Sequence, residues 1–496
     1  MRTTLLCLLL LYCAGSVAQL SVHQPLMDHM VLQRGKLLFL SGMSKPTSKV
    51  QISINEKRND KAVYTTTATS AGYWEITIPA HEASFNSFDI YIVSNEGSIV
   101  YKDILWGDVW LCAGQSNMEF PLKNEMHFKA ELPIKNNPAI RLYNPSYIGK
   151  NRYSNPYPDS IKQTLTASNF YKGEWQILDS VAAPSFSAIG YYFSKIIAQK
   201  VKVPIGIINI SVGGSPIEAW MSEASLLANR NFSNKITGSW LTNNSLPIWI
   251  RQRGIENIGI ADSNGNHAFK PGFLYDAAIQ PLSLLPITGI LWYQGESNAQ
   301  EMARVNEYEA LQSTMIDSYR KAWRQSKLPF YFVQLSSIDT AKYKSHFWQV
   351  FRAVQYNAFI NGHNIGMVAS MDLGAKNDVH PTNKKRVAER LANWALQKQY
   401  AFKDAPTITT PISVIYQNNK VIIKFNSELH APINQTPLGF SLDGITEAAY
   451  TIKGNTVFIQ AATKPKKIYY GFLPYTSANL VDNQGIPLAA FNAIVE

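Results

Sequence analysis

The sequence of 496 residues contains few cysteines and few charged side chains. It has three cysteines, and charged residues make up 16% of the chain. Cys7 and Cys13 lie close to the first residue, which leaves Cys112 alone in the remainder. A single cysteine can form neither an internal disulfide nor a cysteine-based metal site. Because Cys112 lies in an apolar stretch, where a free thiol packs as a small hydrophobic side chain, we interpret it as a core residue and not as a nucleophile.

Long apolar runs are also lacking after the first residues. Arg2, the apolar run 5–12 and the small residues 15–18 follow the order of a secretory signal peptide, so we predict cleavage after Ala18 and export to the periplasm or beyond the cell. The apolar run is too short to span a membrane, and we expect no transmembrane segment once it is removed. Cys13 raises a lipoprotein as an alternative, which Tyr12 in the place of a small residue disfavours.

The positive charge lacks the pattern of a nucleic-acid-binding protein. The net charge is +11, but lysine and arginine are scattered, without a dense run or an alternation with aromatic residues. A phosphate-binding loop of the Gly-Lys-Ser/Thr kind is absent too, which disfavours a phosphoryl-transfer enzyme, and the His and Asp ligands that a metal-dependent deacetylase needs are too few. A basic exported protein favours anionic glycans as partners through long-range attraction. The sequence does not indicate an oligomeric state.

Three regions are expected after the predicted signal peptide at 1–18. Six short strands separated by turns between residues 36 and 104 predict a small N-terminal β-sandwich over 19–105. Strands alternate with helices over 106–405, which predicts a parallel sheet covered on both faces. Residues 406–496 return to short strands and are expected to form a small C-terminal β region. A glycan-binding role for the N-terminal sandwich is left open.

The middle region supplies the elements that would position a site. We expect strands over 109–113, 205–210, 290–293, 329–335 and 365–371, and helices over 187–200, 308–323, 345–359 and 383–399. Residues 120–180 and 223–270 are rich in polar and turn residues, and we expect them to be irregular loops over the active face that decide the substrate. The carboxyl ends of parallel strands meet at one edge of a sheet, so polar groups that follow these strands should converge there.

Ser116 follows the first of these strands after a tight turn. A serine lifted from a strand end by such a turn is how a hydroxyl is presented as a nucleophile, although a polar helix cap has the same composition. His380 is the natural base for it, and Asp378 is placed to reach the ring Nδ1 while Nε2 faces Ser116. The alternative for these two residues is a polar loop before the last helix.

An acyl-transfer site also needs donors for the oxyanion. The backbone N–H of Ser116 is one candidate, and Gly214 or Gly213 supplies the second, because the backbone can approach a substrate where no Cβ intervenes. A side-chain amide, of Gln294 or of Asn298, is a candidate for the third. The glycine pair could equally be only a turn.

Four blocks in this order resemble the sialate O-acetylesterase family of SGNH-type serine esterases: GQSNME at 114–119, GGSPIEAW at 213–220, WYQGESN at 292–298 and DVHP at 378–381. The likeness extends to MVLQR at 30–34, LYDAAIQPL at 274–282, ANL at 478–480 and GIP at 485–487, and so covers nearly the whole mature chain. It implies a flavodoxin-like three-layer α/β/α hydrolase domain without metal or cofactor. It also implies removal of acetyl groups from sugar hydroxyls through an acyl-serine intermediate.

The resemblance assigns roles by position. Ser116 is the nucleophile, His380 the base and Asp378 the acid, and Gly214 and Gln294 resemble the oxyanion donors. The wider SGNH group has two residues between the acid and the histidine, whereas Val379 stands alone here. Some related acetylesterases use the glutamate of a Gln-Gly-Glu motif. Asp378 is therefore the preferred acid, and Glu296, with Asn298, is kept as an alternative acid or as support behind the site.

The expected substrate is an O-acetylated glycan, with 9-O-acetyl sialic acid suggested by the family and acetylated xylan, pectin or another glycan as the alternative. A non-catalytic glycan-binding protein is the alternative of another class. Three aromatic side chains, Trp220, Tyr293 and Trp249, are candidates for stacking on sugar, and each could instead be part of the core.

Overall fold

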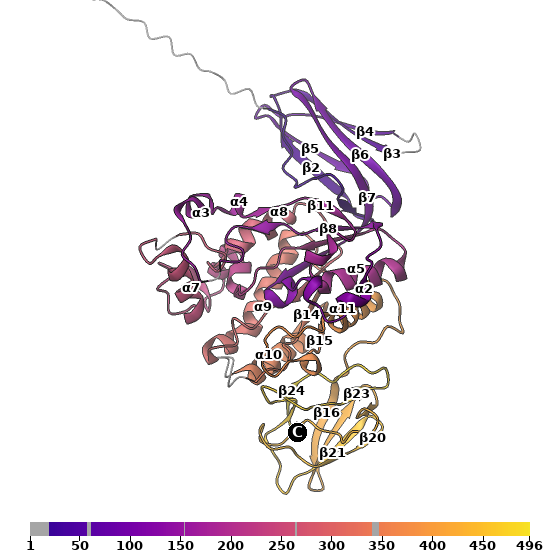
Figure 1. The fold of residues 1–496 in the computed structure, drawn as a ribbon, viewed down its shortest axis with the longest axis vertical. Helices are drawn as coiled ribbons and strands as arrows, with labels where there is room; N and C mark the ends of the chain where they lie inside the picture. The colour runs from indigo at the N-terminus through magenta and orange to yellow at the C-terminus, as the bar shows by residue number, and fades with distance from the viewer. Residues whose placement is uncertain (1–18, 57–60, 153, 263–264, 340–346) are drawn as a thin grey trace, which may run out of the picture.

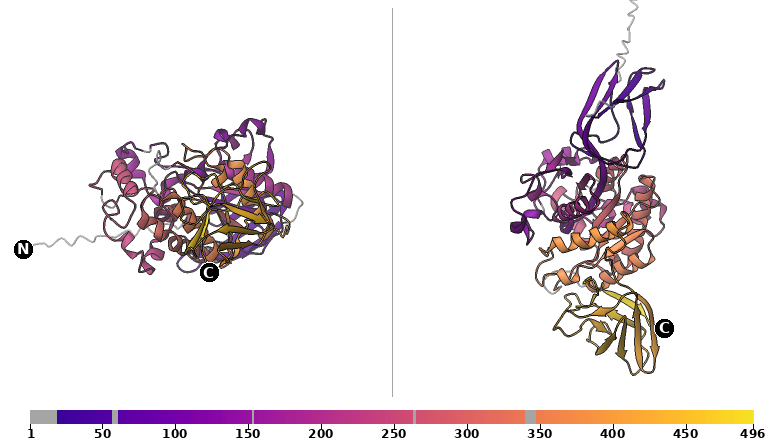
Figure 2. Two further views of the ribbon diagram at one scale, coloured as in Figure 1. Left: turned by 90° about the horizontal axis from the view of Figure 1, so that it is seen from below. Right: turned by 90° about the vertical axis from the view of Figure 1, so that its right-hand side faces the viewer.

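The structure, a computed structural model, describes residues 19–56, 61–152, 154–262, 265–339 and 347–496. The predicted signal peptide at 1–18, with Cys7 and Cys13, lies outside the described residues. The molecule is elongated: a central part of helices and strands lies between an N-terminal β part at one end and a C-terminal β part at the other (Figures 1 and 2).

The N-terminal part contains all six strands predicted between residues 36 and 104. Strands β4, β3, β6 and the first half of β7 form one antiparallel sheet, and β2 pairs with β5. Their bounds are β2 Leu38–Met43, β3 Lys49–Glu56, β4 Lys61–Thr67, β5 Tyr73–Ile78, β6 Ser84–Ser94 and β7 Gly97–Gly114. Val50, Ile52 and Ile54 of β3 are buried at alternate positions, as the two-residue period of a half-buried strand requires.

Strand β7 is shared between the N-terminal sheet and the central part (Figure 1). It runs across the limit predicted between residues 105 and 106, and its second half pairs with the short β1 (Val31–Gln33) and with central strands. The MVLQR block fastens this crossing: Gln33 Nε2 lies 3.0 Å from Asp108 Oδ1, and Arg34 contacts both oxygens of Asp108 at 2.9 and 3.1 Å. The domain limits themselves stay a prediction.

The central sheet has the strand order β11-β8-β12-β7-β13-β14-β15. All neighbours pair in parallel except β11, which is antiparallel to β8. The strands are β8 Asn137–Tyr143, β11 Trp175–Leu178, β12 Ile205–Asn209, β13 Gly289–Tyr293, β14 Phe330–Val333 and β15 Ile365–Val368. Strands β12, β13 and β14 are buried at every position, which is typical of a parallel sheet covered on both faces. The protein is thus a mixed α/β structure.

Four long helices appear where the sequence predicts them: α5 Ala188–Val201, α9 Met302–Ala322, α10 Trp348–Asn361 and α11 Lys384–Lys398. Helices α9 and α10 pack on each other and connect successive strands on one side of β7. Helices α5 and α11 also pack on each other, and α5 leads into β12 on the other side of β7. With right-handed crossovers, the two pairs cover opposite faces of the sheet.

Two segments expected to be irregular contain regular elements, so that prediction was wrong in part. Residues 120–180 include β8 and β11, which extend the central sheet at its edge. The strand signal in β8 is weak because its second residue is Pro138, and a proline argues against a strand inside a sheet. It also carries Arg141, which is buried and ion-paired with Asp103 at 2.7 Å. Residues 223–270 include helices α6 (Glu223–Ala228) and α7 (Ile248–Ile258).

The C-terminal part is formed by short strands, as predicted, and is fastened to α10. Its larger sheets have the orders β16-β17-β21-β20 and β19-β22-β24. Their bounds are β16 Pro411–Gln417, β17 Lys420–Phe425, β19 Phe440–Ser441, β20 Tyr450–Lys453, β21 Thr456–Gln460, β22 Lys467–Tyr470 and β24 Phe491–Ile494. The buried guanidinium of Arg352 donates to the carbonyl oxygens of Gly471 at 3.0 Å and Pro474 at 3.2 Å, which ties this part to the central one.

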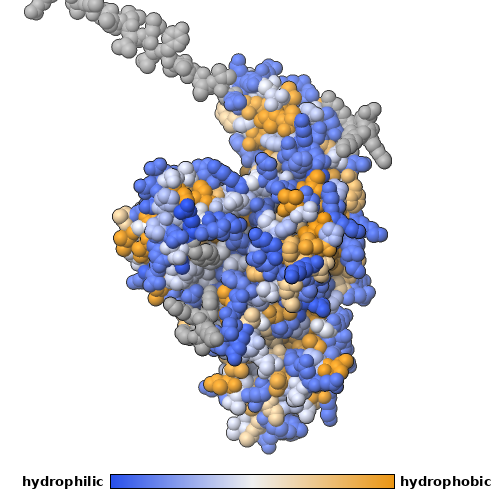
Figure 3. All heavy atoms as spheres, in the orientation of Figure 1, coloured by the Kyte–Doolittle hydropathy of each residue, from blue (hydrophilic) through white to orange (hydrophobic). Residues whose placement is uncertain are grey.

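Hydrophilic and hydrophobic residues are interspersed on the face seen in Figure 3. Within the described ranges, none of the helices combines the length and the apolar character needed to cross a bilayer.

Candidate active site

The site begins where β7 ends and the short helix α1 (Ser116–Glu119) starts. Gly114 has a φ of 128°, and a Cβ at this position would lie 2.2 Å from the carbonyl oxygen of Tyr293. Only glycine therefore allows β7 and β13 to end so close together, with Ser116 immediately beyond. In the order β12-β7-β13, the later strands β12 and β13 lie on opposite sides of β7, so the strand order reverses at β7. Open α/β sheets bind their ligands at the carboxyl ends of the strands at such a reversal.

The structure brings Ser116 and His380 together although 264 residues separate them. The Nε2 atom of His380 lies 2.8 Å from the Oγ of Ser116, which is a hydrogen-bond distance. His380 reaches this position from the loop between β15 and α11. A hydroxyl bonded to an imidazole in this way is the arrangement required for a serine nucleophile and its base. The roles themselves stay predictions at this point.

Neither candidate acid is hydrogen-bonded to the imidazole. Asp378 Oδ1 lies 3.8 Å from Nδ1 of His380, accepts a hydrogen bond from the backbone N–H of the same histidine at 2.8 Å, and belongs to a side chain that is 60% exposed. Glu296 is buried, and its Oε1 accepts a hydrogen bond from Asn117 Nδ2 at 2.5 Å. Asp378 is thus the nearer carboxylate, but it interacts with the ring through a weak, solvent-exposed contact.

The surroundings of His380 favour its neutral form. Burial lowers the pKa of His380 below its ordinary value of 6.5, and the nearby ammonium of Lys384 lowers this pKa further, whereas Asp378 acts in the opposite direction. A neutral imidazole can accept the proton of Ser116, so this environment keeps the base ready at neutral pH.

Backbone donors beside Ser116 fit the oxyanion requirement. Within the part of the chain that the structure describes, the N–H groups of Ser116 and Gly214 have no hydrogen-bond partner. The N–H of Gly213, the alternative to Gly214, donates to Glu119 Oε2 at 2.8 Å and is therefore occupied. Gly214 has a φ of 75°, a conformation that disfavours any side chain. Of the two glycines, Gly214 is the one with a donor to offer.

Gln294 and Asn298 lie behind these donors in the buried core. The amide nitrogen of Gln294 has three acceptors, namely Asn298 Oδ1 at 2.8 Å, the carbonyl oxygen of Ser215 at 3.2 Å and Gln115 Oε1 at 3.3 Å. Asn298 in turn accepts from the N–H of Ile217 at 3.1 Å. Both amides hold the loops of the second and third blocks together. The direct donation by Gln294 stays a prediction, and its contacts indicate a supporting role.

Two residues of the site had no role assigned from the sequence. Asn117 donates through its Nδ2 to Glu296 Oε1 and, at 3.0 Å, to the carbonyl oxygen of Val379 in the histidine loop. The Nζ of Lys384 donates to the Oδ1 of Asn117. Lys384 precedes Val387 and Leu391 by three and seven residues, so it lies on the apolar stripe of α11, and a lysine on such a stripe was the available signal.

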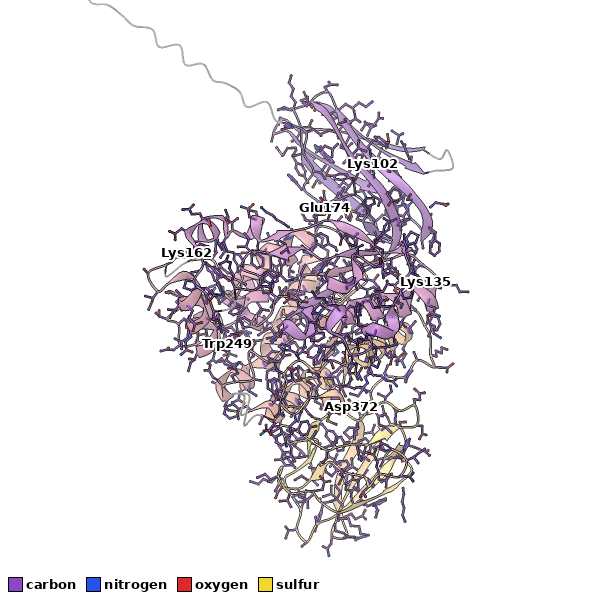
Figure 4. The ribbon with its side chains drawn as sticks, viewed as in Figure 1. Lys102, Lys135, Lys162, Glu174, Trp249 and Asp372 are labelled. Carbon is purple, nitrogen blue, oxygen red and sulfur yellow. The ribbon has the colours of Figure 1, made fainter. Side chains whose placement is uncertain are left out.

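The other candidates from the sequence divide between core and surface. Cys112 is fully buried, and burial raises the pKa of its thiol, which fits its interpretation as a core residue. Trp220 and Tyr293 are buried, so neither is available to stack on a sugar. Trp249 of α7, whose place is labelled in Figure 4, is half-buried, and its indole N–H donates to the carbonyl oxygen of Ser297 at 3.3 Å. Among the described residues, no three His, Cys, Asp or Glu side chains are grouped so that they could hold a metal ion.

Comparisons with known proteins find carbohydrate esterases among the proteins similar to this chain. The family of carbohydrate esterases described as sialic acid-specific acetylesterases matches residues 261–397. A sialate O-acetylesterase of Mus musculus is 24% identical over 441 residues, which cover 81% of this chain and 78% of that protein. The Pongo abelii sialate O-acetylesterase is 26% identical over 324 residues, 61% of this chain, and the match spans only 55% of that protein.

A solved structure resembles nearly the whole chain. It is a carbohydrate acetylesterase from Xanthomonas citri, with a TM-score of 0.76 and 27% identity over 96% of this chain and 99% of that one. The family match at 261–397, the curated relatives and this structure together show that the chain is similar to sialate O-acetylesterases and to a carbohydrate acetylesterase.

Proposed function

We propose that this protein is a carbohydrate esterase that removes O-acetyl groups from sugars through an acyl-serine intermediate. The observation that carries the proposal is the 2.8 Å contact between Ser116 Oγ and His380 Nε2 at the carboxyl end of β7. The relatives named sialate O-acetylesterase and the Xanthomonas citri carbohydrate acetylesterase support an acetyl ester as substrate.

The mechanism follows from the positions of the groups. His380 takes the proton of Ser116, and the Oγ attacks the acetyl carbonyl. The N–H groups of Ser116 and Gly214 stabilise the negative oxygen of the tetrahedral intermediate, and each such donor contributes on the order of 3 kcal/mol to lowering the barrier. His380 then protonates the departing sugar oxygen. Water attacks the acetyl-serine by the same route, which releases acetate and restores the hydroxyl of Ser116.

The supporting residues complete the proposal. Asp378 is the carboxylate nearest to the imidazole, 3.8 Å from Nδ1, and contributes weakly to its orientation, while Gln294 keeps Gly214 in place through the carbonyl of Ser215. The order β12-β7-β13-β14-β15 corresponds to the 2-1-3-4-5 order of flavodoxin-like sheets, which supports an SGNH-type three-layer domain.

Export and removal of residues 1–18 belong to the proposal, since a glycan esterase meets polymeric substrates outside the cell.

The substrate class is tested by acetate release. We propose 9-O-acetylated sialic acid as the first substrate, because the curated relatives carry that name and a net charge of +11 attracts an anionic sugar. The purified protein is assayed against 9-O-acetylated sialosides, acetylated xylan and acetylated pectin at equal acetyl concentration. Faster release from the sialosides supports the sialate assignment, and faster release from xylan or pectin assigns the enzyme to plant glycans. No acetate from any of them contradicts the proposed function.

Trp249 is proposed as the sugar platform beside the site. Its indole N–H is held by Ser297, whose Oγ donates to the carbonyl oxygen of Gly214 at 2.9 Å, so the ring lies next to the oxyanion loop. Phe269 packs against it edge-on with ring centroids 5.3 Å apart. We expect Trp249→Ala to raise KM roughly tenfold for an acetylated oligosaccharide, a loss of about 1.4 kcal/mol of binding. The KM of a small aryl acetate should rise less, because it has no sugar to stack.

Trp249→Phe is the matched control for this prediction, because it keeps an aromatic face and should retain most of the affinity. Steady-state kinetics on both substrates measure the effect. An equal rise of KM for the oligosaccharide and the aryl acetate would remove Trp249 from sugar recognition.

The pH profile should reflect the environment of His380. The base must be neutral to accept the proton of Ser116, and an imidazole is neutral above its pKa. Since burial and Lys384 lower that pKa, we expect kcat/KM to persist at pH values below 6.5 and to fall only when the pH drops through the lowered pKa. The measurement is the acid limb of kcat/KM for a chromogenic acetate. A limb centred above 6.5 would contradict this interpretation of the site.

A further inference from the structure

The loop that carries His380 needs an anchor that Asp378 does not provide. The carboxylate of Asp378 is mostly exposed and is bound to the backbone N–H of His380, with the ring 3.8 Å away. The segment between Gly374 and Lys384 contains neither helix nor strand. The position of the imidazole therefore depends on contacts between this loop and the parts of the site that face it.

Asn117 supplies such a contact from the residue directly after the nucleophile. Its Nδ2 donates to the carbonyl oxygen of Val379 at 3.0 Å and to Glu296 Oε1 at 2.5 Å, while its Oδ1 accepts from Lys384 Nζ. One amide thus joins the nucleophile helix, the loop after β13, the histidine loop and the start of α11. Any movement of this amide would change the separation of Ser116 and His380.

The two charged side chains that contact Asn117, Lys384 and Glu296, are both buried. Lys384 and Glu296 are each 1% exposed, and Glu296 Oε2 has no hydrogen-bond partner within the described chain. The ammonium of Lys384 lies 5.0 Å from the ring centroid of Phe120 and 5.4 Å from that of Tyr293. Burying a lysine ammonium costs free energy unless an opposite charge and hydrogen-bond acceptors surround it. The presence of Lys384 at this buried place therefore indicates a role.

We propose that Lys384 is a positioning residue of the esterase reaction, which fixes the His380 loop through Asn117 and is balanced by the carboxylate of Glu296. This inference rests on the proposed function. It assigns Glu296 to the support of Asn117 instead of direct contact with the histidine. It also gives Lys384 an electrostatic effect on the base, because a cation beside an imidazole disfavours the imidazolium.

Four charged side chains of the described residues act on His380 or on Lys384: Lys384 itself, Asp378, Glu296 and Glu125. His380 faces Lys384 from α11 and Asp378 from its own loop, and Lys384 is additionally near Glu296 and Glu125. Burial lowers the pKa of Lys384 to about 7 and raises the pKa of Glu296, as expected for a pair shielded from water. Removal of the Lys384 charge should therefore move the acid limb of kcat/KM toward higher pH, since its effect on the pKa of His380 is a lowering one.

Lys384→Met tests the proposal, with Lys385→Met as the matched control. Lys385 is the next residue of α11, but its side chain is 37% exposed and pairs with Glu131 at 3.5 Å. We expect Lys384→Met to lower kcat for a chromogenic acetate about 10- to 100-fold, as small misplacements of catalytic groups do, and to shift the acid limb to higher pH. KM should change little. Lys385→Met should leave the rate and the limb unchanged.

A second variant keeps the test decisive if Lys384→Met does not fold. The double variant Lys384→Met with Glu296→Gln removes both buried charges, so no carboxylate is left without its counter-ion, and folding is checked by circular dichroism. The same upward shift of the acid limb in this variant supports the proposal. A folded variant, single or double, with the wild-type kcat and acid limb overturns it. A wild-type protein that releases no acetate would instead refute the proposed function, which separates the two failures.

Discussion

The Ser116→Ala variant is expected to lose at least about 10³-fold of kcat for an acetyl ester while keeping its fold. The hydroxyl of Ser116 forms the covalent bond in the proposed mechanism, and alanine has no atom that can replace it. The residual rate should come from the N–H groups of Ser116 and Gly214, which alanine leaves in place because they belong to the backbone. The measurement is acetate release under single-turnover and steady-state conditions.

The fold of this variant can be verified independently of its activity. Ser116 is half-buried and its Oγ contacts His380 Nε2, so removing this one polar atom should leave the melting temperature close to that of the wild type. A serine with a structural role would behave differently: Ser187 is buried and its side chain accepts a hydrogen bond from the N–H of Gly190 at the start of α5, so Ser187→Ala should lower the melting temperature. Near-normal turnover by a folded Ser116→Ala protein would exclude the acyl-serine mechanism.

The His380→Ala variant is expected to show the second large loss, about 10³- to 10⁴-fold in kcat, because Ser116 is then left without a base. The loss should depend little on which acetyl ester is used, since the imidazole acts on the reacting atoms and not on the sugar. Combining His380→Ala with Ser116→Ala should cost little more than either change alone, because the two groups act as one unit. Additive losses would show that they work independently.

Asp378→Asn gives the matched comparison on the same loop. Its carboxylate is exposed and 3.8 Å from the ring, so the loss in kcat should be well below the roughly 10⁴-fold that follows when a buried triad carboxylate is neutralised. A loss as large as that of His380→Ala would mean that substrate binding draws Asp378 into a direct bond with Nδ1.

Much of the central part could be predicted because its elements are marked by simple patterns. The apolar runs of β12 and β13 are continuous, as buried parallel strands require, and the apolar stripe of α11 repeats at three- and four-residue intervals. A polar block follows each strand that carries a site residue. Because parallel strands end at one edge of a sheet, this pattern was enough to predict that Ser116 and His380 lie close together.

The remainder depends on tertiary contacts that local patterns do not carry. Strand β8 contains a buried arginine whose partner, Asp103, lies on β7, so its place in the sheet was not visible in its own residues. The residues alone did not distinguish Gly213 from Gly214, and only the family resemblance favoured Gly214; the structure gives the physical reason, since the N–H of Gly213 donates to Glu119 Oε2. Lys384 received no role from the sequence, because its acceptor on Asn117 is 267 residues away.

Covalent labelling with an organophosphonate that reacts with activated serines tests the central claim most directly. Such a reagent forms a stable adduct only with a hydroxyl that a neighbouring base has activated, which is the state proposed for Ser116. We expect one label per chain, mapped by peptide mass spectrometry to Ser116, with activity lost in proportion to labelling and no label on His380→Ala. A label on another residue, or full esterase activity after complete labelling of Ser116, would contradict it.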